Sequence, residues 1–305
     1  MKKFLFSILL LFSASSLFAC DICGCGVGSY YIGILPEFNK KIFGIRYRYN
    51  SLKTHLGAGG QSSYLTTHES FHTAEIWGGW NISSRFRLMG YIPVSFNQKE
   101  NQGSASSKNG LGDIGVQGYY QLFNQRRTIG SKLLVHSLWL GAGIKLPTGK
   151  YETPTKEEAA PAANLFQLGT GSVDFTLNAM YDLRIQDAGI NATASYKINT
   201  VNKDDYRYGN KLSMSMQAYY KFRILKAFTL APNAGVLYES AEKDADKGFE
   251  AGMSGGDLLM GTTGVEAGFN KFAVGAGVQH PLLQNLAGGF VKANNRVMVH
   301  ISFLL

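Results

Sequence analysis

The stretch that decides the fold is KIFGIRYRYN, residues 41–50, in which apolar and polar side chains alternate. Apolar or aromatic residues stand at every second position: Phe43, Ile45, Tyr47 and Tyr49. The later positions between them carry charged or amide side chains: Arg46, Arg48 and Asn50. Successive side chains of a strand point to opposite faces, so this period of two predicts a β-strand with one apolar and one polar face.

Twelve stretches of the chain show a pattern that predicts a strand: 41–52, 69–81, 85–97, 111–123, 132–146, 173–183, 189–200, 211–222, 227–239, 257–269, 271–281 and 296–305. The connectors between them alternate strictly in length. The long ones are 53–68, 98–110, 147–172, 201–210, 240–256 and 282–295, and the short ones are 82–84, 124–130, 184–188, 223–226 and 270. Short turns at one end and long loops at the other are typical of a membrane barrel.

The sequence therefore predicts an all-β fold, a membrane-spanning up-and-down antiparallel β-barrel over residues 41–305. Because the expected strand count is even, both chain ends should lie on the periplasmic side. In the strand over 173–183, the expected outward residues are Phe175, Leu177, Ala179, Tyr181 and Leu183. Aromatic residues expected near strand ends suit the girdles at the two lipid interfaces: Tyr47, Tyr49, Trp80, Tyr91, Tyr119, Tyr120, Tyr219, Tyr220 and Tyr238.

Residues 1–19 are predicted to be an export signal. Lys2 and Lys3 precede an apolar run over 4–11, and small residues follow before Ala19. This order is typical of a secretory signal peptide, and the apolar run is too short to span a membrane comfortably. Removal of the signal would leave residues 20–40 as a cysteine-containing periplasmic segment before the barrel. The expected compartment is the outer membrane of a Gram-negative-type bacterium.

The three cysteines of the chain stand together in this segment as Cys20, Cys23 and Cys25. Residues 17–20, LFAC, resemble a bacterial lipoprotein signal in which Cys20 is lipidated, whereas ordinary cleavage after Ala19 would leave the same residue with a free thiol. Both alternatives stay open. Thiolates this close can also share a soft metal ion such as Cu(I) or Zn(II). Lipidation or oxidation in the envelope would remove those ligands, so a simple tether is the expected role.

Three glycine-rich motifs lie where strands are expected to begin or end. They are GLGDIG at 110–115, GAGIKLPTGK at 141–150 and LGTGS at 168–172. In this order they resemble the family of outer-membrane barrels named for the meta-pathway of phenol degradation. The resemblance covers most of residues 41–305 and implies a transport-type barrel, without supplying a substrate. Taken alone, the glycines indicate bending and tight turning at the barrel rims.

The interior of the expected barrel carries many charges. The candidates for pore lining are Arg46, Arg48, Glu75, Arg87, Asp113, Lys145, Asp174, Asp182, Lys197, Glu266 and His300, with Lys221, Glu239 and Arg296 on the same expected face. Mutual pairing that fills and stiffens the lumen is the expected role. A selective pore is the alternative, because rings of fixed charge tune permeation. Asp113, Lys145 and Asp174 are expected near the outer mouth, where they could form a charged constriction.

The functional expectation is a channel or transporter-like barrel for small solutes, which the resemblance suggests are hydrophobic or aromatic. The alternative is a non-transport barrel whose cysteine cluster binds a soft metal or a partner protein. An enzyme is not expected, because His136, His280 and His300 fall on different strands with no serine in a recognisable motif. The formal net charge of +9 is scattered, so nucleic acid is not expected either. The expected partners are outer-membrane lipids and a small-molecule solute; the pattern gives no oligomeric state.

Overall fold

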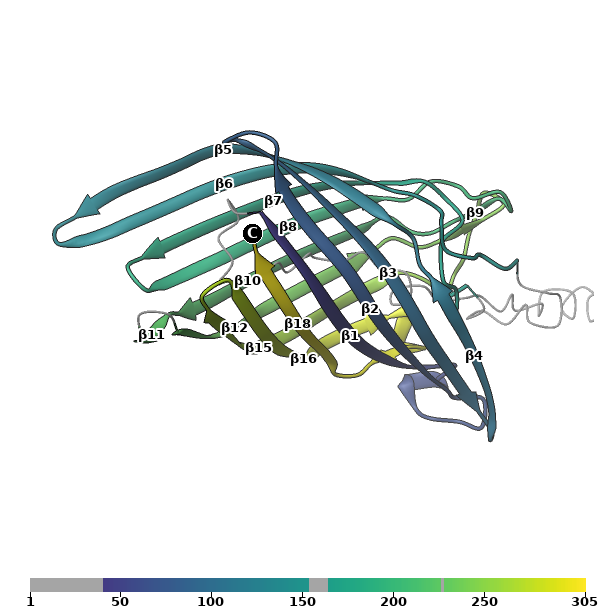
Figure 1. The fold of residues 1–305 in the computed structure, drawn as a ribbon. Helices are drawn as coiled ribbons and strands as arrows, with labels where there is room; N and C mark the ends of the chain where they lie inside the picture. The colour runs from purple at the N-terminus through teal and green to yellow at the C-terminus, as the bar shows by residue number, and fades with distance from the viewer. Residues whose placement is uncertain (1–40, 154–163, 226–227) are drawn as a thin grey trace, which may run out of the picture.

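The computed structural model describes residues 41–153, 164–225 and 228–305, and these form a closed antiparallel β-barrel (Figure 1). Its wall consists of β1 (Ile42–Thr54), β2 (Thr67–Asn81), β3 (Phe86–Asn101), β5 (Gly115–Ile129), β6 (Lys132–Lys145), β7 (Asp174–Ile185), β8 (Ala188–Ile198), β10 (Lys211–Tyr220), β12 (Phe228–Ala241), β15 (Gly256–Phe269), β16 (Phe272–Leu286) and β18 (Arg296–Leu304). Each wall strand pairs with the next along the chain, and β18 pairs with β1 to close the barrel. The twelve strands expected from the alternating pattern are confirmed.

Shorter elements decorate the end of the barrel that carries the long loops. β4 (Ser104–Leu111) pairs with β3, and β17 (Lys292–Ala293) pairs with β1. A separate small sheet contains β9 (Tyr206–Arg207), β13 (Ala245–Asp246) and β14 (Phe249–Glu250), and two 3₁₀ turns are η2 (Ala58–Gly60) and η3 (Ala287–Gly289). At the other end β11 (Phe222–Leu225) pairs with β12. Among the described residues, no helix is both long enough and apolar enough to cross a membrane.

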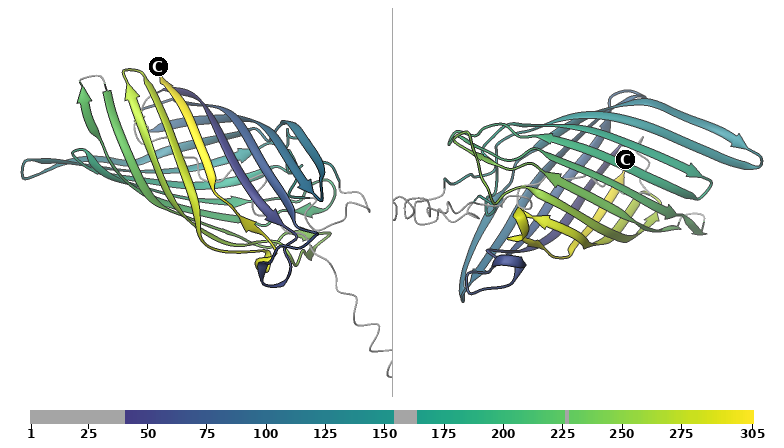
Figure 2. Two further views of the ribbon diagram at one scale, coloured as in Figure 1. Left: turned by 90° about the horizontal axis from the view of Figure 1, so that it is seen from below. Right: turned by 180° about the vertical axis from the view of Figure 1, so that it is seen from behind.

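Two polar stretches expected to be connectors prove to be strand, and residues 223–225 of the expected connector 223–226 lie in β11. Residues 98–110, expected to be a loop, form the end of β3 and most of β4, which pair as a hairpin beyond the barrel wall. Residues 124–130, expected to be a short connector, lie mostly in β5, which stays paired with β6 up to Ile129. The β5–β6 hairpin consequently projects beyond its neighbours at the short-turn end (Figures 1 and 2). Both stretches are polar, which is why composition alone suggested loops.

The GLGDIG motif is a β-bulge within one long strand, not the opening of a strand. Tyr91 of β3 pairs with Gly115, and Val94 pairs with Leu111, so two residues of β3 face three residues at 112–114. An extra residue of this kind bends the strand and redirects a side chain. Here the residue turned inward is Asp113, which is buried.

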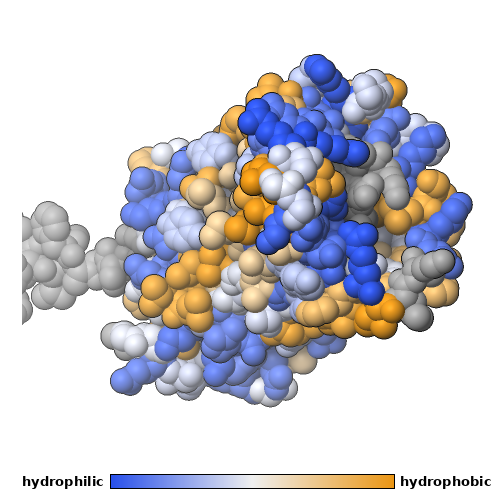
Figure 3. Space-filling model, turned by 90° about the vertical axis from the view of Figure 1, so that its left-hand side faces the viewer, coloured by the Kyte–Doolittle hydropathy of each residue, from blue (hydrophilic) through white to orange (hydrophobic). Residues whose placement is uncertain are grey.

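The apolar face of the wall points outward, as the alternation predicted. The cross-strand row of Ile45, Ile76 and Ile92 is about half exposed, at 54%, 47% and 43%. The side chains between them face the interior. Viewed from the short-turn end, hydrophilic residues gather on the projecting parts, with hydrophobic residues between them (Figure 3).

The girdle assignment is wrong for three tyrosines. Tyr91, Tyr119 and Tyr219 face the interior and are 4%, 4% and 6% exposed. Tyr91 has the same parity along β3 as Arg87, so strict alternation already placed it inside. Trp80, Tyr120 and Tyr220 are exposed on the outer face, where a girdle residue belongs.

Large inward side chains lie against glycines of the neighbouring strand. The Tyr91 ring covers Gly115, the Tyr119 ring covers Gly141, and the Tyr219 ring covers Gly189 so closely that a Cβ at each glycine would collide with the ring. A strand glycine often marks such a close approach. Because the rings lie along the wall, they take up less of the lumen than side chains pointing to its centre would.

We expect Gly141→Val to destabilise the barrel by about 1–3 kcal/mol, because overpacking forces side chains from their rotamers. A Cβ at Gly141 would lie 2.6 Å from the Tyr119 ring and 3.0 Å from the Gly118 carbonyl oxygen. The measurement is the thermal midpoint of heat-modifiable gel mobility. Gly90→Val is the control, because a Cβ there meets no atom closer than 3.9 Å. Equal midpoints for the two variants would contradict the packing argument.

Candidate functional site: the charged interior of the barrel

A buried ionic cluster lies at the long-loop end of β6, β7 and β8. The Nζ of Lys145 is 2.7 Å from Asp113 Oδ2 and 2.6 Å from Asp174 Oδ2. Lys197 approaches the same Asp174 oxygen at 3.3 Å. These four side chains are at most 7% exposed. The structure thus brings together four of the residues predicted for the pore lining.

The three glycine-rich motifs build this cluster. The bulge in the first motif turns Asp113 inward, and the second motif carries Lys145 at the end of β6. The third motif returns the loop to the barrel, where the Thr170 backbone N–H donates to Asp113 at 2.9 Å. The Gly149 N–H donates to the other oxygen of the Asp113 carboxylate at 2.9 Å. The motifs therefore hold a loop to the wall as well as bending it.

Two further charge groups extend the cluster around the interior. Lys211 lies opposite Lys197 in the β8–β10 register and contacts Glu239 at 3.0 Å. Arg296 of β18 reaches the same carboxylate at 2.8 Å. On β1 and β2, Arg46 and Arg48 both pair with Glu75. We call these groups, together with the Lys145 cluster, the charged belt; their residues are Arg46, Arg48, Glu75, Asp113, Lys145, Asp174, Lys197, Lys211, Glu239 and Arg296.

The remaining predicted residues also face the interior but lie away from the Lys145 cluster. His300 is 3.8 Å from Glu266, and Arg87 donates to Asn81 at 3.1 Å. Asp182 accepts a hydrogen bond of 3.3 Å from the Tyr219 hydroxyl. Lys221 lies close to the ring of Tyr219, at 5.4 Å from its centroid. That any of these residues meets a solute or an ion stays a prediction.

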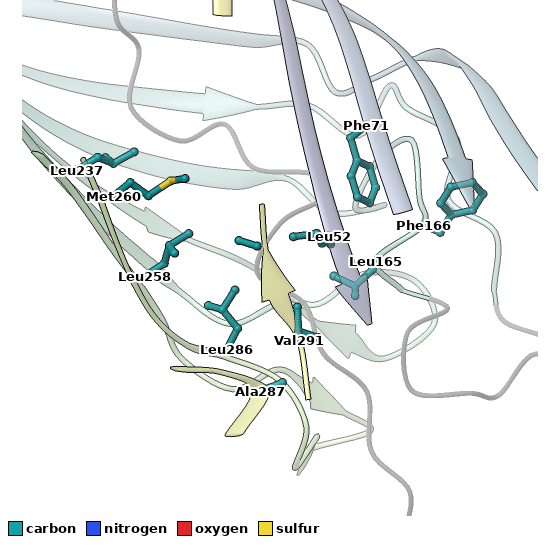
Figure 4. Close-up of a cluster of buried hydrophobic side chains, with 11 residues drawn as sticks. Leu52, Phe71, Leu165, Phe166, Leu237, Leu258, Met260, Leu286, Ala287 and Val291 are labelled. Carbon is teal, nitrogen blue, oxygen red and sulfur yellow. The ribbon is translucent and has the colours of Figure 1, made fainter. Parts of the chain in front are cut away.

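An apolar cluster occupies the interior beside the belt (Figure 4). Leu165 and Phe166 come from the loop between β6 and β7 and are buried against inward residues of the wall. The Phe166 ring makes an edge contact with Phe71 of β2, with centroids 6.5 Å apart. The whole cluster comprises Leu52, Phe71, Leu165, Phe166, Leu237, Leu258, Met260, Leu286, Ala287, Val291 and Ala293. The loops thus bring apolar side chains into the mouth of the barrel.

The two sides of the interior below the belt differ in side-chain size. A second buried cluster on β1 to β6 consists of Ile42, Trp77, Met89, Tyr91, Tyr119 and Trp139. Several inward residues on β7 to β12 are small or polar and partly accessible, although Tyr219 and Leu237 are buried there. The accessible ones are Asn178, Thr193, Ser195, Ser215, Gln217 and Gly235. Asn178 Nδ2 and Gln217 Oε1 have no hydrogen-bond partner among the described residues. Buried polar atoms without a partner also occur on the β1–β6 side, so it is the partial accessibility of these β7–β12 residues that indicates open space in the lumen.

The sequence interpretation missed this aromatic side. Trp77, Met89 and Trp139 were not singled out, although each occupies an inward position by strict alternation. The signal that could have found them is an aromatic or thioether side chain at a position that the alternation assigns to the polar, inward face of a strand.

A buried carboxyl group lies in the loop cap above the barrel, between β12 and β13. Asp244 accepts hydrogen bonds from the Tyr206 hydroxyl at 2.6 Å and the Gly209 N–H at 2.7 Å. Burial outweighs these hydrogen bonds and nearby Arg207, and it raises the pKa of Asp244 to about 7. The cap is therefore held partly by a carboxyl group that titrates near neutral pH.

The predictions for Cys20, Cys23 and Cys25 lie outside the described residues. Among the described residues, no three His, Cys, Asp or Glu side chains are grouped so that they could hold a metal ion. A metal at the cysteine cluster and lipidation of Cys20 both stay predictions.

Comparison with known proteins identifies the family. The family model described as "Putative MetA-pathway of phenol degradation" matches residues 49–282, which is most of the chain. The chain belongs to this family. The resemblance carried by the glycine motifs is thus confirmed, and two of the three motifs contribute residues whose side chains pair in the Lys145 cluster. No curated protein sequence matches the chain.

Solved structures share the barrel. The COG4313 outer membrane channel from Pseudomonas putida F1 superposes with a TM-score of 0.60 at 14% identity, covering 92% of this chain and all of that one. The beta domain of the Bordetella autotransporter BrkA gives a TM-score of 0.49 at 11% identity, covering 87% of this chain and 100% of that one. The transport unit of the autotransporter AIDA-I from Escherichia coli gives 0.47 at 12% identity, covering 91% and 94%. At these identities the likeness concerns the fold.

We expect Lys145→Met to loosen the loop between β6 and β7. The change leaves Asp113 and Asp174 facing each other without the cation between them, and removing one partner of a buried ionic group costs about 3–5 kcal/mol. In the purified protein in detergent, trypsin should then cleave faster after Lys150, an exposed residue of this loop. Lys243→Met is the control, since its pair with Glu250 is exposed and contributes about 0–1 kcal/mol. Unchanged cleavage in Lys145→Met would show that the ionic cluster does not hold the loop.

We expect the loop cap to be more stable at pH 5 than at pH 8. A carboxyl group whose pKa is raised on folding stabilises the folded state below its ordinary pKa of 3.8, and the effect is lost as the pH rises through 7. Hydrogen–deuterium exchange of residues 206–209, corrected for the intrinsic rate, should therefore be slower at pH 5. Asp244→Asn should remove the difference, because the amide oxygen still accepts hydrogen bonds without titrating. A difference that persists in the variant would assign the effect to another group.

Proposed function

We propose that the chain is an outer-membrane channel that passes small solutes through the barrel lumen. The observation that carries the proposal is the partly accessible polar surface along β7 to β12, to which inward residues such as Asn178, Thr193 and Gln217 contribute. A barrel whose interior is packed throughout would leave no such surface. Membership of the family and the likeness to an outer membrane channel support the same function.

We place the short turns and both ends of the barrel in the periplasm. β1 begins and β18 ends at the short-turn end, where the Leu305 N–H donates to the Lys41 carbonyl. In outer-membrane barrels the periplasmic turns are short and the outer loops are long. With this orientation, the apolar cluster, the Lys145 cluster and the group formed by Lys211, Glu239 and Arg296 lie towards the extracellular mouth. The pair of Arg46 and Glu75 lies deeper, next to the row of Ile45 and Ile76.

We propose that the solutes are small hydrophobic or aromatic molecules. Leu165 and Phe166, with the apolar residues around them, form the mouth, and Trp77 and Trp139 lie on one side of the lumen below. Apolar surface at a constriction repels water and ions more than it repels an apolar solute. The belt is internally paired with mixed signs, so simple anion or cation selection is disfavoured. Such transport requires no catalytic group.

We expect Gly277→Phe to reduce single-channel conductance in planar bilayers. Gly277 faces the interior of β16, and a Cβ there meets no atom closer than 3.5 Å, so the ring can enter the lumen without disturbing the wall. Val278→Phe is the matched control, because its side chain is exposed on the outer face. Liposome swelling with a small aromatic alcohol and with a sugar of similar size tests the solute class. A wild-type protein that conducts neither ions nor solutes would end the proposal, as would equal conductance of the two variants.

A further inference from the structure

A hollow of about 590 Å³ lies on the outer face of the barrel, at the long-loop end of β1 to β4. Its lining includes six polar residues of the outer face: Ser51, His68, Ser70, Gln98, Glu100 and Ser107. These residues face away from the lumen, because they share the outward parity of Tyr47 and Phe96 on their strands. The channel does not use this hollow.

The register shows where the hollow lies relative to the lipid. Along the outer face of β1 to β3, the row of Ile45, Ile76 and Ile92 is wholly apolar. Two rows further on, Tyr49 pairs with His72, and His72 pairs with Phe96. Aromatic residues of this kind mark the interface between lipid and water.

The next row beyond this interface is entirely polar. Ser51 pairs with Ser70, Ser70 with Gln98, and Gln98 with Ser107. The row after it contains His68 and Glu100. The hollow therefore begins where the apolar band ends, at the depth occupied by lipid headgroups.

The lining has the chemistry that recognises hydroxyl groups. Its serines are small enough to leave the space open, and the side chains of Ser70, Gln98 and Ser107 make no hydrogen bond to another described residue. The hydroxyls both donate and accept, and so does the amide of Gln98. Among the described residues, the charged residues of the lining are Glu69, Lys99 and Glu100, so the hollow carries no net positive charge to attract a phosphate.

We propose that this hollow binds the sugar headgroup of an outer-leaflet glycolipid. The lipid's acyl chains would lie along the apolar rows below, while its sugar hydroxyls would meet Ser70, Gln98 and Ser107. The position just outside the lipid band and the hydroxyl and amide groups of the lining both favour a glycolipid over a phospholipid. This site is separate from the lumen, so it stands or falls independently of conduction.

The test uses the full-length protein in nanodiscs of phosphatidylethanolamine with and without an added phosphate-free glycolipid, a diglycosyl diacylglycerol. Glycolipid retained per protein is measured by native mass spectrometry. Ser70→Phe, which fills the hollow, and Gln98→Leu, which removes the amide at similar size, should each lower retention by about tenfold, because a lost hydrogen bond of about 1.4 kcal/mol corresponds to that factor. Ser240→Phe is the matched control; Ser240 lies on the outer face at the loop end of β12 and outside the hollow.

Heat-modifiable mobility verifies that each variant is folded, and conductance should equal that of the wild type. Retention that falls in both hollow variants but not in Ser240→Phe would support the site. Equal retention by wild type and Ser70→Phe would overturn it, as would an equal loss in Ser240→Phe, which would indicate ordinary lipid annulus. Phosphatidylethanolamine retention that falls in parallel with the glycolipid would overturn the preference for a sugar.

Discussion

The pairing of β1 with β18 is the interaction on which the rest of the structure depends. Eight consecutive residue pairs, from Ile42 with Leu304 to Tyr49 with Val297, join the two ends of the chain and turn an open sheet into a barrel. Closure gives hydrogen-bond partners to backbone N–H and C=O groups that lipid could not satisfy. Together with the number and stagger of the strands, closure fixes the diameter of the barrel. Every inward side chain must then fit within that diameter.

The glycine contacts show how the interior meets this limit. Tyr119 lies over Gly141 and Tyr219 lies over Gly189, so each large ring occupies the space that a side chain on the neighbouring strand would otherwise fill. His300 lies over Gly275 in the same manner. The same arrangement recurs around the barrel, on β5 and β6, on β8 and β10, and on β16 and β18. Large inward side chains therefore lie along the wall and leave space nearer the centre of the lumen.

The alternating pattern was sufficient to predict the wall but not its irregularities. Strand number, direction and facing follow from the period of two, since one face meets lipid and a slip of one residue would expose the wrong set. The β3–β4 hairpin and the projecting end of β5 were missed because both stand outside the lipid, where no apolar face is required. Lys108 and Arg126 are as acceptable on such a strand as in a loop, so composition carries no signal there.

The candidate site, like the wall, was predictable where the strands are regular and unpredictable where they are not. Parity was enough to place Lys145, Asp174 and Lys197 inside, because each lies within or at the end of a regular strand. The contact of Asp113 with Lys145 depends on one extra residue in a bulge and on a loop that returns through Thr170, and neither changes the apolar period. Tyr91 was assigned to the outer face for another reason. The expected girdle of aromatic residues was given more weight than the alternation along β3, which places Tyr91 inside.

The charged belt contributes more to the positioning of the loop between β6 and β7 than to the net stability of the fold. Taking charges out of water costs several kcal/mol per ion, and apolar residues of similar volume often stabilise a fold as well. Apolar replacements would not, however, fix the position of the loop, because apolar contacts are not directional. Lys145 is satisfied only when the bulge presents Asp113 and the start of β7 presents Asp174, and the same Asp113 carboxylate accepts the backbone N–H groups of Gly149 and Thr170. Thr170 lies four residues beyond Phe166, so the ionic cluster determines where the apolar residues enter the mouth. The charges thus fix the position of the loop that carries Leu165 and Phe166.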